Sequence, residues 1–127
     1  MKPYETLTVC GSEIHLKITT ANAVKLEEQL GTDLLSGLEK LAEVKTLAKY
    51  YFAAAVSLND SISTIDDIYQ LFDDFVTDGG ELDTLQKLII EVLLVSGILS
   101  RETYDMQKKL TGKQKAALLE MQRKLLN

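Results

Sequence analysis

Five aspartates in one short segment, STIDDIYQLFDDFVTDGG, are the residues most suggestive of chemistry in this sequence. Carboxylates are preferred calcium ligands, but the alternating ligands, central glycine and final glutamate of an EF-hand loop are not in register here. The aspartates instead recur at helical spacing, at Asp66, Asp67, Asp73, Asp74 and Asp78. We therefore predict a solvent-exposed acidic helix face, with no metal site and no cofactor.

Cys10 and His15 are the only cysteine and the only histidine of the chain. A nucleophilic pair needs both side chains within hydrogen-bond reach, whereas these two fall on opposite sides of one predicted hairpin. We expect His15 to point away from the core with Glu13 and Lys17. Paired carboxylates occur on the acidic face alone, where nothing desolvates them. The sequence thus predicts no catalytic residues and no enzyme.

The segment YETLTVCGSEIHLKIT alternates apolar and polar residues in period two, which indicates a β-hairpin. Gly11-Ser12 is the expected turn. Leu7 and Val9 share one face before the turn, and Ile14, Leu16 and Ile18 share one face after it. An isolated hairpin is marginally stable in water, so this apolar face should rest on helices.

Helical spacing begins after Thr20. Thr19 or Thr20 can cap a first helix that Gly31 closes, and Thr32 can cap a second segment, TDLLSGLEKLAEV, whose middle Gly37 weakens. Three further helices are expected over residues 45–58, 64–78 and 81–98. The fourth predicted helix carries an apolar arc of Ile65, Ile68, Tyr69, Leu71, Phe72, Phe75 and Val76. We predict an α+β fold, an N-terminal hairpin packed on a mostly α-helical bundle of about five to six helices.

The helix that begins near Glu81 turns apolar on its second face from Ile90 onward, where Ile90, Leu94 and Ile98 project. A helix that is apolar all round must be covered all round. The cover could be the C-terminal segment, whose stripe is Leu118, Met121 and Leu125, or a second copy. Alternatively the segment offers its stripe to another protein. These six residues are the predicted partner-binding residues.

Charge divides the chain. Residues 1–100 hold seven Lys/Arg against sixteen Asp/Glu, and residues 101–127 hold seven against three. We predict a core domain over residues 1–100, and over 101–127 a basic amphipathic segment that belongs to this domain or forms a tail. An acidic body disfavours nucleic acid, and the longest apolar run is too short to span a membrane. A single cysteine and no secretion signal favour the cytoplasm.

The order of these elements, the hairpin, LEEQLG, an Ala-rich helix, an acidic helix with DGG and a hydrophobic helix ending in SG, resembles the tail assembly chaperones of long-tailed bacteriophages and prophages of Gram-positive bacteria. The resemblance covers about residues 4–99. It implies a chaperone that binds the tape-measure protein, keeps its helical segments soluble and helps recruit the tail-tube protein in the host cytoplasm. A longer frameshifted form is common in such phages.

Two other classes of function fit the same sequence. One is a small helical adaptor or regulatory protein that uses its basic tail to bind an acidic partner or nucleic acid. The other is a structural tail subunit that forms homo-oligomers through its apolar helix and remains in the particle. Neither class requires a catalytic motif, so the residues alone leave both open.

Overall fold

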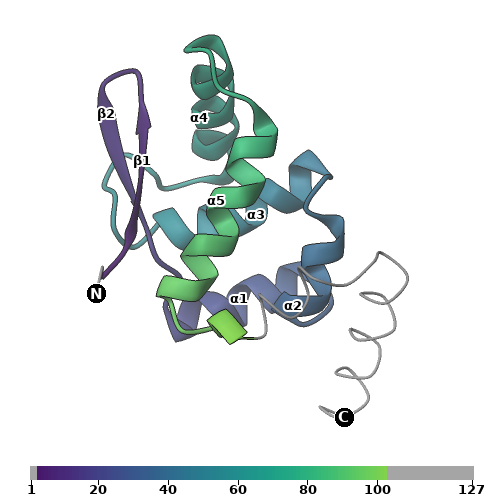
Figure 1. Cartoon of the computed structure of the whole chain (residues 1–127). Coiled ribbons are helices and arrows are strands. Elements are labelled where there is room, and N and C mark those ends of the chain that lie inside the picture. The colour runs from purple at the N-terminus through teal and green to yellow at the C-terminus, as the bar shows by residue number, and fades with distance from the viewer. Residues whose placement is uncertain (1–2, 103–127) are drawn as a thin grey trace.

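A computed structural model describes residues 3–102 of the chain. Two strands, β1 (Glu5–Val9) and β2 (Ser12–Leu16), precede the helices. The helices are α1 (Thr20–Leu30), α2 (Leu34–Gly37), the short 3-10 helix η1 (Leu38–Lys40), α3 (Val44–Ala55), α4 (Ile65–Thr77) and α5 (Leu82–Val95). An antiparallel hairpin followed by helices confirms the predicted α+β fold (Figure 1). Most of the predicted C-terminal segment lies outside the described residues, so the domain boundary stays a prediction.

The hairpin turns at Cys10-Gly11, one residue earlier than predicted. Val9 pairs with Ser12, and the two turn residues both have positive φ angles, 50° and 81°. Positive φ at both positions is characteristic of a type I′ turn, whose twist matches that of the strands, and glycine adopts this backbone without steric cost. Ser12 therefore belongs to β2, and Cys10 lies at the tip of the hairpin.

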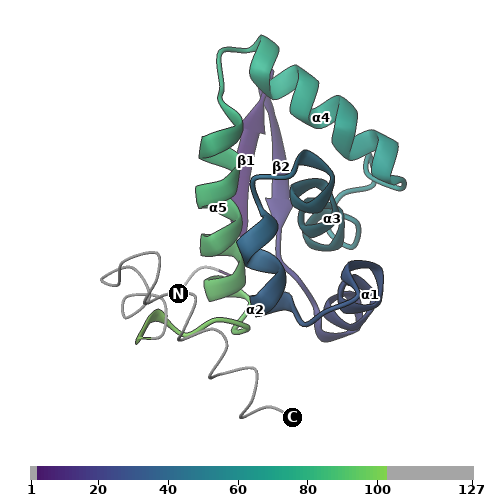
Figure 2. The same ribbon diagram turned by 90° about the vertical axis from the view of Figure 1, so that its right-hand side faces the viewer.

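Helices cover the inner face of the hairpin. Leu7, Val9, Ile14 and Leu16 are buried on that face, as the period-two pattern predicts. Figure 2 shows α5 on the β1 side of this face, α3 on the β2 side and α4 near the hairpin tip. The two-stranded sheet is thus one wall of a single hydrophobic core rather than a separate unit.

Asn59 closes the outer edge of β2. Its side-chain carbonyl accepts a hydrogen bond from the His15 N–H at 3.0 Å, and its amide donates to the His15 carbonyl at 2.7 Å. The same amide donates to the Ala55 carbonyl at 2.9 Å. One residue beyond β2, the Lys17 N–H donates to the Ala54 carbonyl at 3.0 Å. Asn59 therefore ties the strand to the end of α3.

Caps define α1 and α2, in part as predicted. Thr19 caps α1 by accepting a hydrogen bond from the Asn22 N–H at 3.2 Å, and Gly31 ends it with a φ of 71°. The prediction that Thr32 caps the next helix is wrong: the Asp33 carboxylate accepts from the Ser36 N–H at 3.1 Å. The predicted continuous helix is also interrupted, because α2 ends at Gly37 and the chain tightens into η1.

Helix α3 is the centre of the core. Tyr50 and Tyr51 are buried, and each hydroxyl donates to a backbone carbonyl of another element, Tyr50 to Leu34 and Tyr51 to Leu85 at 2.7 Å. The helix ends at Ala55, so the prediction that it runs to residue 58 is wrong. Leu58 lies beyond it and is exposed, because the chain has turned to bring Asn59 to β2.

Helix α4 begins with a reciprocal cap. The Thr64 hydroxyl accepts from the Asp67 N–H at 3.4 Å, while the Asp67 carboxylate accepts from the Thr64 N–H at 2.9 Å. Such a capping box satisfies two backbone donors that the first turn leaves free. Ile68, Leu71 and Phe72 are buried, and the Phe72 ring meets Tyr51 edge-on with ring centroids 5.3 Å apart.

Helix α5 buries Leu85, Ile89, Val92 and Leu93. It ends at Val95, three residues before the predicted end, since Gly97 has a φ of 78° and the N–H groups of Ile98 and Leu99 donate to the Leu93 carbonyl. Ile98 therefore lies beyond the helix rather than on its second face. None of the helices within residues 3–102 has the length and apolar character required to cross a bilayer.

We expect Phe72→Ala and Leu93→Ala each to lower the free energy of unfolding by about 2–5 kcal/mol, because truncating a buried side chain leaves a cavity. Both side chains are buried in the core. Urea unfolding followed by circular dichroism measures the loss. Leu58→Ala is the matched control and should cost far less, since Leu58 is exposed. Equal losses at Leu58 and Leu93 would contradict this placement.

We expect Gly37→Ala to destabilise the fold by about 1–3 kcal/mol, as overpacking does, although alanine favours helix. A Cβ atom at this position would lie 2.5 Å from the Tyr50 hydroxyl oxygen and 3.0 Å from Leu30 Cδ1. The double variant with Tyr50→Phe removes the clashing oxygen, so the cost of Gly37→Ala should be smaller in that background. An equal cost in both backgrounds, measured by urea unfolding, would refute the contact.

Candidate functional site

Exposed apolar side chains concentrate in one groove. Among the described residues, five large hydrophobic side chains are exposed, and three of these, Val44 (48%), Tyr69 (41%) and Val76 (48%), line the same hollow. The groove lies between the start of α3, one side of α4 and the start of α5, and holds about 630 Å³. Such a concentration of exposed apolar surface is typical of a site that binds another molecule.

Side chains of α4 form the floor and one wall of this groove. Phe72, only 4% exposed, belongs to both the core and the groove. Tyr69 and Val76 lie one turn away on either side of Phe72, on one margin of the apolar arc that the sequence predicts for this helix. The two side chains are exposed because α3 and the hairpin cover the centre of the arc and leave this margin open.

The turn between α4 and α5 sets the other wall. Gly79 adopts a φ of 98°, and the Gly80 N–H donates to the Phe75 carbonyl at 2.9 Å, so the chain reverses within a few residues. This reversal brings Leu82, the first residue of α5, to the groove beside Val76. Any side chain at Gly80 would collide with the Phe75 ring. Both glycines of the DGG sequence are therefore required by the turn that shapes the groove.

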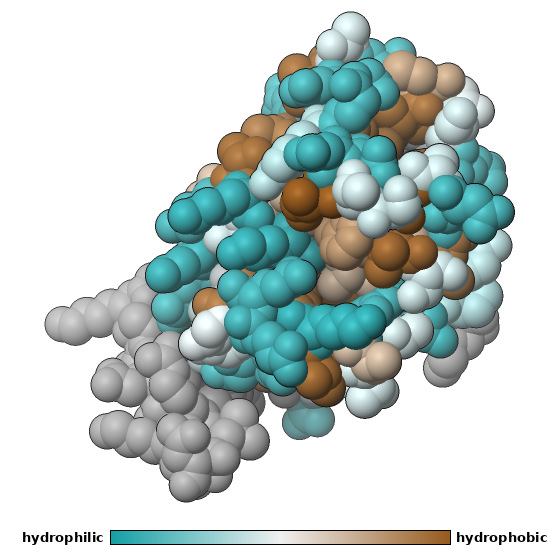
Figure 3. All heavy atoms as spheres, turned by 180° about the vertical axis from the view of Figure 1, so that it is seen from behind, coloured by the Kyte–Doolittle hydropathy of each residue, from teal (hydrophilic) through white to brown (hydrophobic). Residues whose placement is uncertain are grey.

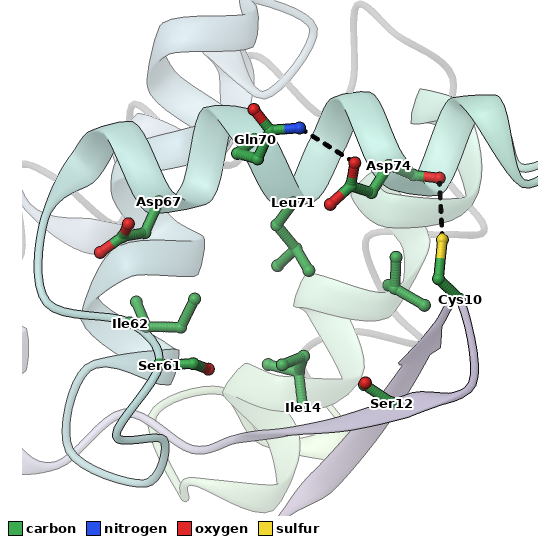
Figure 4. A pocket seen from close by; sticks show the side chains of 10 residues that line it. Cys10, Ser12, Ile14, Ser61, Ile62, Asp67, Gln70, Leu71 and Asp74 are labelled. Carbon is green, nitrogen blue, oxygen red and sulfur yellow. Dashed lines mark hydrogen bonds between the residues drawn. The ribbon is translucent and has the colours of Figure 1, made fainter.

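A second, smaller pocket lies between the hairpin tip and α4, and holds about 270 Å³ (Figure 4). It is lined by other residues of α4 than the groove is. Three of the residues that line it, Cys10, Gln70 and Asp74, are joined by hydrogen bonds. The Asp74 carboxylate accepts from Gln70 Nε2 at 2.9 Å, and Cys10 Sγ lies 3.8 Å from the Asp74 carbonyl oxygen. The Cys10 N–H donates to the Asp78 carboxylate at 3.3 Å. These contacts hold the hairpin against α4.

Two titratable groups of this pocket, Cys10 and Asp67, have shifted pKa values with structural causes. Desolvation and the neighbouring carboxylates of Asp78 and Asp74 raise the pKa of the Cys10 thiol, which favours the protonated, less nucleophilic form. Hydrogen bonds from the backbone N–H groups of Ser63 and Thr64 lower the pKa of Asp67. The predicted acidic face is thus not merely solvated, since Asp67 and Asp74 of α4 and Asp78 just beyond it each accept a hydrogen bond.

His15 differs from its predicted exposure. It is half-buried, with its ring centroid 4.4 Å from that of Tyr4 and its Nδ1 3.5 Å from the Thr6 hydroxyl oxygen. Within residues 3–102, no three side chains of His, Cys, Asp or Glu come together in a way that could hold a metal ion. The histidine therefore packs on the hairpin surface rather than taking part in a cluster of ligands.

Outside the groove, exposed apolar side chains are more scattered. Seen from behind, hydrophilic atoms are densest over the lower part of the molecule, and hydrophobic atoms appear near the middle, at the upper right and along the upper left edge (Figure 3). A hollow of about 190 Å³ between α1 and α3 includes the buried Asn22 amide. That amide already donates to the Ala53 carbonyl at 3.3 Å and to Ser57 Oγ at 2.8 Å. Its hydrogen-bonding capacity serves the packing of α1 on α3.

Three of the six predicted partner-binding residues are described by the structure, and none of these three lines the groove. Ile90, Leu94 and Ile98 are half-buried and pack against the core. The other three, Leu118, Met121 and Leu125, lie outside the described residues, so their role stays a prediction. Sequence reasoning missed Val44 and Leu82 as groove residues, and their places at the first turns of two helices were the available signal.

Comparisons of the chain with models of protein families, with curated proteins and with solved structures find no match. The resemblance to phage tail assembly chaperones stays an expectation from the order of elements in the sequence. Among the described residues, the groove is the strongest candidate for a binding site because its apolar side chains are exposed.

We expect Asp67→Asn to destabilise the protein at neutral pH and to have a smaller effect in acid. The folded-state pKa of Asp67 lies below its ordinary value of about 3.9. The ionised carboxylate therefore stabilises the fold above that ordinary value, and this stabilisation is lost as the pH falls through the lower folded-state pKa. Urea unfolding of parent and variant over a series of pH values measures the difference. A difference that stays constant with pH would contradict it.

Proposed function

We propose that the protein is a non-enzymatic assembly chaperone for the tail of a long-tailed phage or prophage of Gram-positive bacteria. It binds the tape-measure protein in the host cytoplasm and assists assembly of the tail-tube protein around it. The observation that carries the proposal is the apolar groove at Val44, Tyr69 and Val76, where a small domain exposes apolar side chains that can bind a partner. The order of elements in the sequence adds the particular client.

Holding a long helical client requires apolar surface that is accessible without unfolding the chaperone. Helical segments of such a client present apolar stripes that would otherwise associate with one another. The groove offers side chains that are already exposed, with Phe72 as a fixed floor beneath them. Binding alone can then keep the client dispersed, because no conformational change of the core is needed to reach it.

Net charge fits the same role. The chain carries a formal charge of −5, and residues 1–100 hold most of its acidic groups. Mutual repulsion between acidic bodies opposes clumping of chaperones that are loaded with an apolar client. An apolar groove on a negatively charged protein is therefore compatible with a chaperone that must stay dispersed until its client enters the growing tail.

Co-expression with the tape-measure protein encoded in the same phage or prophage genome tests the proposal. We expect the tape-measure protein to move from the pellet to the supernatant and to copurify with the affinity-tagged full chain. We also expect the chain to be absent from purified, completed particles. The matched control is the tape-measure protein co-expressed with an unrelated acidic helical protein of similar size.

Other results would overturn the proposal. A tape-measure protein that stays in the pellet and does not copurify would contradict chaperone activity. Stoichiometric presence of the chain in purified particles would identify a structural subunit. Binding to an acidic partner through residues 101–127, with no effect on the tape-measure protein, would identify an adaptor.

A further inference from the structure

Acidic and apolar side chains alternate along the groove side of α4. Asp66, Tyr69, Asp73 and Val76 follow one another at spacings that place them on one side of a helix, and all four are exposed. Asp73 itself lines the groove. The sequence of α4 contains no lysine or arginine, so no cation on this helix neutralises the stripe. The apolar surface of the groove is therefore bordered by negative charge.

Acidic residues also border the groove at the starts of α3 and α5. Glu43 precedes Val44, and Glu81 precedes Leu82, so each wall residue has an acidic neighbour. The cations on these two helices are Lys45, Lys49 and Lys87. Lys49 Nζ donates to the Gln29 carbonyl at 3.3 Å, and Lys87 is paired with Asp83, with Nζ 3.2 Å from the carboxylate. Acidic groups thus outnumber unpaired cations in the sequence around the groove.

The dimensions of the apolar stripe match one face of a helix. Tyr69 and Val76 are seven residues apart, which is two helical turns or about 10 Å along the axis. A partner helix that presents apolar residues at i, i+3, i+4 and i+7 offers anchors over the same length. An acidic rim discriminates among such helices, because basic residues beside the stripe gain attraction and acidic residues meet like charge.

We propose that the groove between α3, α4 and α5 binds an amphipathic helix of a partner protein whose apolar stripe is flanked by lysine or arginine. Val44, Tyr69 and Val76 contact the apolar stripe, and Asp66 and Asp73 face the basic flanks. The groove is then the surface with which the proposed chaperone holds its client, and in that respect the assignment rests on the proposed function. It names the chemistry of the client segment, which the proposed function leaves open.

Fluorescence anisotropy with two labelled helical peptides tests the assignment on the full chain. One peptide consists of leucine and lysine, with leucine at helical amphipathic spacing, and the other has glutamate in place of every lysine. We expect the leucine–lysine peptide to bind at least about tenfold more tightly than its acidic counterpart, and the preference to shrink as salt screens the rim.

Matched variants locate the binding. Val76→Glu should weaken the leucine–lysine peptide by about tenfold or more, whereas Val24→Glu, at an equally exposed position on α1 outside the groove, should not. Asp73→Lys should reduce or reverse the preference between the peptides. Asp60→Lys makes the same charge change at an exposed position outside the groove and should leave a larger preference than Asp73→Lys does.

Several outcomes would overturn the assignment. Equal losses with Val76→Glu and Val24→Glu would show binding without use of the groove. Concentration-dependent self-association that Val76→Glu abolishes would assign the groove to a second copy. Changes in the resonances of Tyr69 and Val76 on Leu118→Glu, without peptide, would assign it to the C-terminal segment. The peptides can fail while the tape-measure protein still copurifies, so failure of the groove and failure of the chaperone proposal are distinguishable.

Discussion

Two buried tyrosine hydroxyls on adjacent residues of α3 constrain how the helices pack. A hydroxyl taken out of water without a partner costs free energy, so each must reach an acceptor. Tyr50 finds the Leu34 carbonyl in α2 and Tyr51 finds the Leu85 carbonyl in α5, on different sides of the central helix. Burial raises the pKa of both phenols, so they stay protonated donors. The close approach at Gly37 and the edge-on contact with Phe72 both follow from these positions.

Much of the fold follows from local sequence signals. Period-two alternation locates the hairpin, and helical spacing with Thr19 and Gly31 locates α1, because these signals act between near neighbours. The errors lie where distant contacts decide. Helix α3 ends at Ala55 because Asn59 is needed at β2, and no local rule couples residue 59 to residue 15. Helix propensity marks Gly37 as a weak point of its helix, but in the fold this glycine makes room for Tyr50.

The groove was harder to predict than the fold. A helical wheel assigns Tyr69 and Val76 to the apolar arc of α4, but it cannot tell which margin of an arc is covered. That depends on the angle at which α3 and the hairpin cross α4. The sequence directed attention instead to the second face of α5, where Ile90 and Leu94 prove to be half-buried. The apolar residues of α4 and α5 indicate that each helix has surface to bury. Which part of that surface stays exposed depends on how the helices pack.

The Asn59 side chain protects the edge of β2 from pairing with the strand of another copy of the chain. An unpaired strand edge is a template on which identical chains can stack by backbone pairing, and natural proteins blunt such edges. A primary amide has the same donor and acceptor pair as a peptide group, so Asn59 imitates one residue of a neighbouring strand and occupies the middle of the β2 edge. Aspartate at this position would keep the acceptor and lose the donor. The asparagine thus works as a built-in terminator of sheet growth on that side.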